Sequence, residues 1–265
     1  MVDAAGAGAD PSEPVSAPAG AALYSTRHLA SSTSISSRAS PASYPGSGAR
    51  RAARLGAVEA LIAILAGGRA TRLGGRKATA ELAGRPLISY PLAAALGSGQ
   101  DAIVVAKPRT ELPKLSVPTL REPAEPVHPL CGLVSALRQG EGRPVIALAC
   151  DLPLVTPELL DWVASQRDPL VVPRIEGRLQ PLLARYEASL LRDLEADLHA
   201  QRPLQETVAR LHPRVIDEEE IARFGRPDRL LLNVNSEADL QRAGRLLRGT
   251  LPAPGRPRPR QRGLG

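Results

Sequence analysis

Short apolar runs alternate with helical patterns between residues 57 and 248, and this alternation restricts the fold more than any other feature of the chain. The expected strands are 58–65, 102–106, 117–120, 145–149, 170–173 and 230–234. The expected helices are 86–96, 129–139, 156–166, 187–200, 203–211 and 236–247. A chain that alternates in this way forms a mostly parallel sheet with helices on both faces. The sequence therefore predicts the α/β class.

The first expected strand runs directly into a loop that is rich in glycine and cations. The strand, 58–65, is apolar apart from Glu59 and is expected to be buried. Residues 65–77 (LAGGRATRLGGRK) hold four glycines and four cations but no acid. Glycines allow backbone N–H groups to face an anion at close range, so the loop is expected to bind phosphates. Lys77 follows Leu65 by twelve residues and can fold back onto the same phosphates.

An ordinary solvated turn is the alternative interpretation of this loop. The loop has neither the Gly-Lys-Ser/Thr of a Walker loop nor the GxGxxG spacing of dinucleotide-binding proteins. The pattern thus predicts a phosphate-binding loop but argues against a kinase, a GTPase or a dinucleotide enzyme of those types.

Two carboxylates, Glu122 and Asp151, follow the ends of other expected strands. Ligands of such sheets bind beyond the carboxyl ends of the strands, so both carboxylates should converge with the glycine loop. Asp151 is the first polar residue after the strand, and a carboxylate there can hold Mg²⁺ that also contacts substrate phosphates. Capping of the next helix is the alternative role, but Thr156 before Pro157 already fills that position.

The segment Asn233-Val234-Asn235 places two amides at alternate positions of an expected strand end. Side chains at alternate positions point to one face of a strand, so both amides can reach a metal-bound phosphate or a substrate. Helix N-capping by Asn235 or Ser236 is the alternative for at least one of these residues.

The net charge of +7 belongs mostly to the two ends of the chain. Residues 1–54 hold five arginines against three acids, and residues 249–265 hold four arginines and no acid. The body between them has 25 basic and 24 acidic residues, so it is nearly neutral. Only 2% of the residues are aromatic, which leaves few rings on which bases could stack. The body is therefore not expected to bind nucleic acid.

The two ends of the chain and its cysteines bear on order and compartment. Residues 1–55, which are rich in Ala, Ser, Gly and Pro, and residues 249–265, which are rich in Pro and Arg, are expected to be disordered.

Two cysteines, Cys131 and Cys150, make no disulfide framework or zinc site, and both are expected in the core. No apolar run approaches the ~20 residues of a membrane span, and no secretory signal is present. A cytoplasmic protein without membrane association is the expectation.

Taken together, these motifs resemble the molybdenum cofactor guanylyltransferase family of nucleotidyltransferases. The matching segments are 65–77, 84–87 (GRPL), 128–132 (HPLCG), 149–153 (ACDLP), 177–182 (GRLQPL) and 233–235 (NVN). The resemblance covers about residues 57–247. It implies a Rossmann-like fold of the nucleotide-diphospho-sugar transferase type, with one domain at 56–248 between disordered ends.

The resemblance also implies roles for particular residues. The implied nucleotide-binding residues are Leu65, Ala66, Gly67, Gly68, Lys77, Glu122 and Asp151, and the implied acceptor-binding residues are Gln180, Pro181, Asn233 and Asn235. Asp151 and Asn235 would bind Mg²⁺, and the implied catalytic residues are Arg69, Lys77 and Asp151. The implied substrates are GTP and molybdopterin, and the implied reaction transfers GMP to the acceptor's terminal phosphate with release of pyrophosphate.

Two positions depart from the family pattern and leave the choice of base open. Ala106 stands where some members have a base-contacting Asn, and His128 replaces a usual Gly. Glu122 stands where the family usually has an Asp that contacts the base. A cytidylyltransferase or a sugar-phosphate nucleotidyltransferase of the same fold is therefore an alternative. The segment 180–182 and the absence of a second C-terminal domain favour the pterin acceptor.

A non-catalytic nucleotide-binding adaptor, which would deliver cofactor to a partner enzyme, is an alternative from another class. Lys77, Asp151 and Asn235 are all present, which favours the enzyme. Molybdoenzymes or their chaperones are candidate protein partners in either case.

Overall fold

The computed structural model describes residues 59–67 and 77–250 of the chain. The predicted N-terminal extension, 1–55, lies outside them, as do residues 251–265 of the predicted disordered tail, 249–265. Gly249 and Thr250 belong to helix α9 (Glu237–Thr250), so the tail was predicted to begin two residues too early. No helix of the described part is long and apolar enough to cross a membrane.

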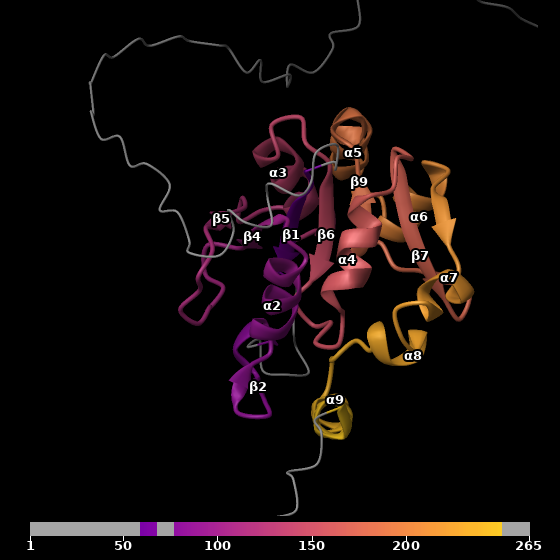
Figure 1. Ribbon diagram of the computed structural model, residues 1–265. Coiled ribbons are helices and arrows are strands. Elements are labelled where there is room, and N and C mark those ends of the chain that lie inside the picture. The colour runs from indigo at the N-terminus through magenta and orange to yellow at the C-terminus, as the bar shows by residue number, and fades with distance from the viewer. Residues whose placement is uncertain (1–58, 68–76, 251–265) are drawn as a thin grey trace, which may run out of the picture. The chain divides into compact units, whose positions relative to one another are not determined.

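An eight-stranded sheet forms the centre of the described structure (Figure 1). Its strand order is β10-β7-β9-β6-β1-β4-β5, with β8 paired to β7 beside this path. The bounds are β1 Leu61–Leu65, β4 Asp101–Ala106, β5 Thr119–Arg121, β6 Val145–Ala149, β7 Leu170–Ile175, β8 Arg178–Leu179, β9 Leu183–Tyr186 and β10 Arg214–Ile216. Strand β9 runs antiparallel to β6 and β7, whereas β1, β4, β5 and β6 pair in parallel. The predicted α/β class with a mostly parallel sheet is confirmed.

Helices pack on both faces of this sheet, as the alternation predicted. Helices α2 and α4 share one buried cluster with the sheet, and α3, α5 and α6 share the cluster on the opposite face. The bounds are α2 Ser89–Gly97, α3 Pro129–Gln139, α4 Pro157–Ala164, α5 Leu191–His199, α6 Leu204–Arg210, α7 Glu218–Ala222, α8 Pro227–Leu230 and α9 Glu237–Thr250. Two short strands, β2 (Glu81–Leu82) and β3 (Arg85–Pro86), form a separate antiparallel pair.

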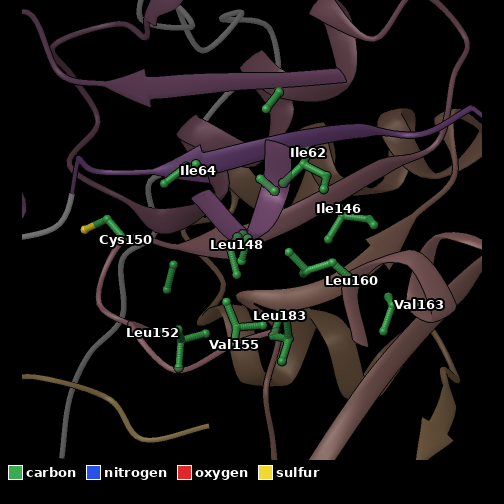
Figure 2. Close-up of a cluster of buried hydrophobic side chains, with 14 of the residues drawn as sticks. Ile62, Ile64, Ile146, Leu148, Cys150, Leu152, Val155, Leu160, Val163 and Leu183 are labelled. Carbon is green, nitrogen blue, oxygen red and sulfur yellow. The ribbon is translucent and has the colours of Figure 1, made fainter. Parts of the chain in front are cut away.

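The core follows from the apolar pattern of the central strands. Along β1, Ile62 and Ile64 point into the cluster beneath α2 and α4, while Leu61 and Ala63 point into the opposite cluster. Successive strand residues face opposite sides of a sheet, so a strand covered on both sides must be apolar throughout. Figure 2 shows the first cluster, where these isoleucines lie near Leu148 of β6.

We expect Leu148→Ala to lower the free energy of unfolding by about 3 kcal/mol. Leu148 is fully buried at the centre of the sheet, so its truncation removes apolar contacts and leaves a cavity. Equilibrium urea unfolding followed by circular dichroism measures the loss. The matched control is Leu96→Ala on α2, where the side chain is 48% exposed and a change below about 0.5 kcal/mol is expected. Equal losses of unfolding free energy in the two variants would contradict the placement of Leu148 in the core and of Leu96 at the surface.

The sequence prediction of a strand at 230–234 is wrong. Helix α8 occupies its beginning, and the rest is extended chain that joins no sheet. Pro227 favours the start of a helix because its backbone angle is already fixed near the helical value. The strand prediction considered only the apolar pattern and overlooked this helix signal. The Val234 N–H donates to the Asp151 carbonyl at 3.0 Å instead of to a strand.

Several short elements were absent from the prediction. These are β2, β3, β8, β9, β10, α7 and α8, each of two to five residues. Strand β9 contains Arg185, which is buried and donates to the Asp168 carbonyl at 2.7 Å and to Glu187 at 3.0 Å. A charged residue in so short a strand interrupts the apolar pattern, so the sequence did not predict the strand. The hydrogen bonds to Asp168 and Glu187 compensate for the cost of burying the Arg185 charge.

Candidate active site

The strand ends bring the first site residues together. Leu65 ends β1, and its carbonyl accepts a hydrogen bond from the Cys150 N–H after β6 at 3.3 Å. The Ala66 N–H donates to the Val105 carbonyl of β4 at 2.8 Å. The beginning of the glycine loop therefore lies between the ends of β4 and β6, at the carboxyl edge of the sheet, as predicted from the sequence. Gly68 and Arg69, the other predicted residues of this loop, lie outside the described residues.

Lys77 joins two of the predicted site residues. Its ammonium donates to Oδ2 of Asp151 and, at 2.6 Å, to Oδ1 of Asn235. Lys77 begins the short 3-10 helix η2 (Lys77–Thr79), whereas its two partners lie 74 and 158 residues further along the chain. Asp151 is 6% exposed, so its carboxylate is largely shielded from water while it pairs with the Lys77 ammonium.

The alternative capping role does not apply to the Asp151 side chain. Helix α4 is capped by Thr156, whose Oγ1 accepts from the Leu159 N–H at 3.3 Å. The backbone carbonyl of Asp151 accepts from Val234, which brings the 233–235 segment beside it. The side chain of Asp151 is thus available to the site.

The segment 233–235 belongs to no helix or strand; Val234 is buried, and Asn233 and Asn235 are exposed. Ser236, rather than Asn235, caps the start of α9, because its Oγ accepts from the Asp239 N–H at 3.3 Å. Asp239 in turn accepts from the Asn235 N–H at 3.1 Å. The Asn235 side chain is therefore left to contact Lys77, while that of Asn233 lines the adjacent groove.

Asp151 and Asn235 fit a magnesium site by their chemistry and their placement. Both contribute oxygen atoms, and these oxygens already converge on one cation, the Lys77 ammonium. Mg²⁺ prefers oxygen ligands and commonly takes only one or two from the protein, with waters and substrate phosphates as the others. Within 59–67 and 77–250 no three His, Cys, Asp or Glu side chains gather into a metal cluster, so a closed all-protein cage is not built there.

Glu122 occupies a tight space between two glycines. A Cβ on Gly67 would lie 2.2 Å from Glu122 Oε1, and a Cβ on Gly132 would lie 3.2 Å from Oε2. The Glu122 N–H donates to the Ala106 carbonyl at 3.1 Å, so Ala106 contributes only its backbone here. Burial raises the pKa of Glu122, and this rise is opposed by the nearby Lys107 ammonium. The carboxylate thus lies directly against the start of the glycine loop.

The predicted acceptor residues line a continuous groove beside Asp151. Gln180, Pro181 and Asn233 line a pocket of about 320 Å³ together with Asp151. A second pocket, of about 460 Å³, shares Gln180 and Asn233 with the first and extends to Asn235. This second pocket, the distal pocket, also contains Arg178, which belongs to the matched segment 177–182, and Arg242, a cation that the sequence prediction missed. Arg242 lies 64 residues after Arg178, so no local sequence pattern linked the two cations, and only the fold brings them together.

The histidine and cysteines near the site have structural roles. His128 Nδ1 accepts from the Leu130 N–H at 3.2 Å and caps α3. Burial raises the pKa of the Cys150 thiol to about 12 and also raises that of Cys131. Both thiols stay protonated near neutral pH and are buried, as predicted, so neither supplies a thiolate.

Comparisons with known proteins identify the family of the chain. Residues 62–215 match the family described as the MobA-like NTP transferase domain. A probable molybdenum cofactor guanylyltransferase of Bacillus licheniformis is 31% identical over 191 residues, which are 67% of this chain and 93% of the relative.

Solved structures share the fold. Molybdopterin-guanine dinucleotide biosynthesis protein A of Archaeoglobus fulgidus superposes with a TM-score of 0.61 at 24% identity, over 71% of this chain and 99% of that one. The 2-C-methyl-D-erythritol 4-phosphate cytidylyltransferase of Thermus thermophilus gives a TM-score of 0.53 at 20% identity, over 72% and 99%. The family match and the relative's identity together show that the chain belongs to the MobA-like NTP transferase family of nucleotidyltransferases.

Proposed function

We propose that the protein transfers GMP from GTP to the terminal phosphate of molybdopterin and releases pyrophosphate. The observation that carries this proposal is the Lys77 ammonium, which is joined both to Asp151 beyond the end of β6 and to Asn235. These three groups are suited to phosphates and to Mg²⁺, and they border a groove large enough for a second substrate. The name of the Bacillus licheniformis relative supports the choice of substrates.

The reaction needs positioning and charge more than proton transfer. A phosphate oxygen of the acceptor forms a bond to the α-phosphorus of GTP, and the bond from that phosphorus to the pyrophosphate oxygen breaks. The phosphate nucleophile is already ionised near neutral pH, so no general base is required. Asp151 and Asn235 would hold Mg²⁺, which when bound neutralises negative charge on the reacting phosphates.

Lys77 would stabilise the leaving pyrophosphate. Lys77 lies at the end of the glycine loop and its side chain is 20% exposed, so its ammonium can reach phosphates bound beside Asp151. A fixed cation aimed at developing negative charge lowers the barrier because it needs no reorganisation during the reaction. Arg69 is proposed from the sequence to act with it.

Glu122 would select the base. Guanine presents two neighbouring N–H donors, at N1 and at its 2-amino group, and a carboxylate can accept both. The Watson–Crick edge of cytosine offers a single amino donor, so the same carboxylate favours GTP over CTP. A cytidylyltransferase is the second candidate, because solved structures of that activity share the fold.

The experiment that tests this proposal supplies the full chain with Mg²⁺, molybdopterin and each NTP in turn, and follows pyrophosphate release. Release with GTP alone is expected. Release only with CTP would overturn the guanylyl assignment. Faster release with a sugar phosphate than with molybdopterin would overturn the acceptor. Binding of GTP without release under any condition would favour the adaptor.

We expect Arg242→Ala to raise the KM for molybdopterin by about 10-fold and to leave the KM for GTP unchanged. Arg242 lines the distal pocket, where it would pair with an anionic group of the acceptor. Initial rates at varied acceptor concentration measure the effect. Arg245→Ala removes an exposed cation one turn further along α9 and serves as the matched control. Equal KM changes in both variants would show that the effect comes from the net charge of the protein and not from a contact between Arg242 and the acceptor.

A further inference from the structure

Lys107 connects three groups at the edge of the nucleotide site. It is the first residue after β4, and its side chain is 14% exposed. Its ammonium donates to the Pro123 carbonyl at 2.7 Å and to the Pro126 carbonyl at 2.9 Å. The same nitrogen lies 3.6 Å from Glu122 Oε2. The two carbonyls therefore accept hydrogen bonds from Lys107, and the carboxylate forms an ion pair with the same ammonium just beyond hydrogen-bond distance.

The carboxylate that faces Lys107 is confined and incompletely satisfied. Oε1 of Glu122 lies against Gly67 and Oε2 against Gly132, so a side chain at Gly67 would clash with the carboxylate and one at Gly132 would crowd it. Oε2 is buried and accepts no hydrogen bond from the described residues. A buried carboxylate oxygen without a donor is costly, so a ligand that brought an N–H donor to this carboxylate would be favoured.

We propose that Lys107 is a positioning residue that fixes Glu122 and the 122–126 turn so that the carboxylate accepts two neighbouring N–H groups of a purine base. The inference rests on the proposed use of GTP. Its ligand class is a purine nucleotide with donors at both N1 and the 2-position. Lys107 does not touch the base in this arrangement, because its ammonium is bonded to the Pro123 and Pro126 carbonyls and faces the carboxylate as an ion pair.

The charge of Lys107 also favours the ionised form of Glu122. The groups that face this carboxylate are the Lys107 ammonium and the Cys131 thiol, and burial raises the pKa of both Glu122 and Cys131. Lys107 opposes the rise for Glu122, so its removal raises the pKa of that carboxyl further. A protonated carboxyl is a poorer acceptor for two N–H groups. Base recognition in such a variant should therefore recover as the pH rises.

The test measures binding of GTP and of ITP, which lacks the 2-amino group, to the full chain by calorimetry. The wild type should bind GTP about 10-fold more tightly than ITP. Lys107→Met should lose about 10-fold in GTP affinity at neutral pH and bind both nucleotides nearly equally. Lys107→Arg should restore most of the preference, since it keeps the charge. In turnover assays the loss should appear mainly in the KM for GTP.

Lys114→Met, which removes an exposed lysine from the same β4–β5 connection, is the matched control. Circular dichroism verifies that each variant is folded. The proposal is overturned if Lys107→Met keeps the wild-type preference for GTP, or if it weakens GTP and ITP equally at every pH. The binding test needs no acceptor, so it is independent of the proposed transfer. A chain that discriminates through Lys107 but transfers nothing to molybdopterin would refute the reaction and leave this inference standing.

Discussion

Asp151→Asn should lower turnover by about 10²- to 10³-fold at saturating GTP and molybdopterin. Asparagine preserves the size of the side chain but removes the negative charge that faces Lys77 and that would hold Mg²⁺. The fold should survive, because Val234 is held by the backbone carbonyl of Asp151 and not by its carboxylate. Initial rates of pyrophosphate release over a range of Mg²⁺ concentrations measure the effect.

Asp193→Asn provides the matched control for this variant. Asp193 is an aspartate on α5 whose side chain is 54% exposed, and its only described ion pair is a long one, of 3.8 Å, to Arg210. Its replacement should leave turnover within about twofold of the wild type. Near-normal turnover of Asp151→Asn at all Mg²⁺ concentrations would remove Asp151 from the catalytic site.

Lys77→Met should lower turnover by about 10²-fold, again with the fold intact. Methionine keeps an unbranched apolar chain of similar length, so the change removes mainly the ammonium that contacts Asp151 and Asn235. Without this cation the charge that accumulates on the leaving pyrophosphate is less well neutralised. Single-turnover rates with GTP bound at saturation separate this effect from weakened binding.

Lys77→Arg is the informative companion, because arginine keeps the charge but presents it on a larger planar group. Its turnover should fall between those of the wild type and Lys77→Met. Lys114→Met controls for loss of a lysine elsewhere on the surface. If Lys77→Met retained normal single-turnover rates, the contacts of Lys77 with Asp151 and Asn235 would have only a structural role.

Long elements with clear end signals were predictable from the sequence. Helix α3 begins and ends where the pattern placed it, because Pro129 starts it and a regular apolar face runs through it. Strand β6 was also predicted with its observed bounds. The extended segment after α8 was not, since its apolar residues pack beneath α9 and β2 rather than within the sheet. Sequence periodicity indicates burial but does not identify the element against which a residue is buried.

The convergence of Glu122, Asp151 and the start of the glycine loop was predictable because parallel strands end at one edge. The same rule could have found Lys107, which also follows a strand directly. Its role was hidden because its partners are backbone carbonyls 16 and 19 residues away, which no side-chain pattern reveals. Asn235 was predicted to reach a phosphate or metal, whereas its contact with Lys77 emerged only from the fold.

The most direct test of the proposed reaction follows labelled phosphorus from GTP in the presence of Mg²⁺ and molybdopterin. Label at the α-phosphate should appear in a product with the mass of a molybdopterin guanine dinucleotide, and label at the γ-phosphate should appear in pyrophosphate. Both should depend on Asp151 and Lys77. Recovery of the α-label only as free GMP or GDP, or in a product that forms without molybdopterin, would contradict the proposed transfer.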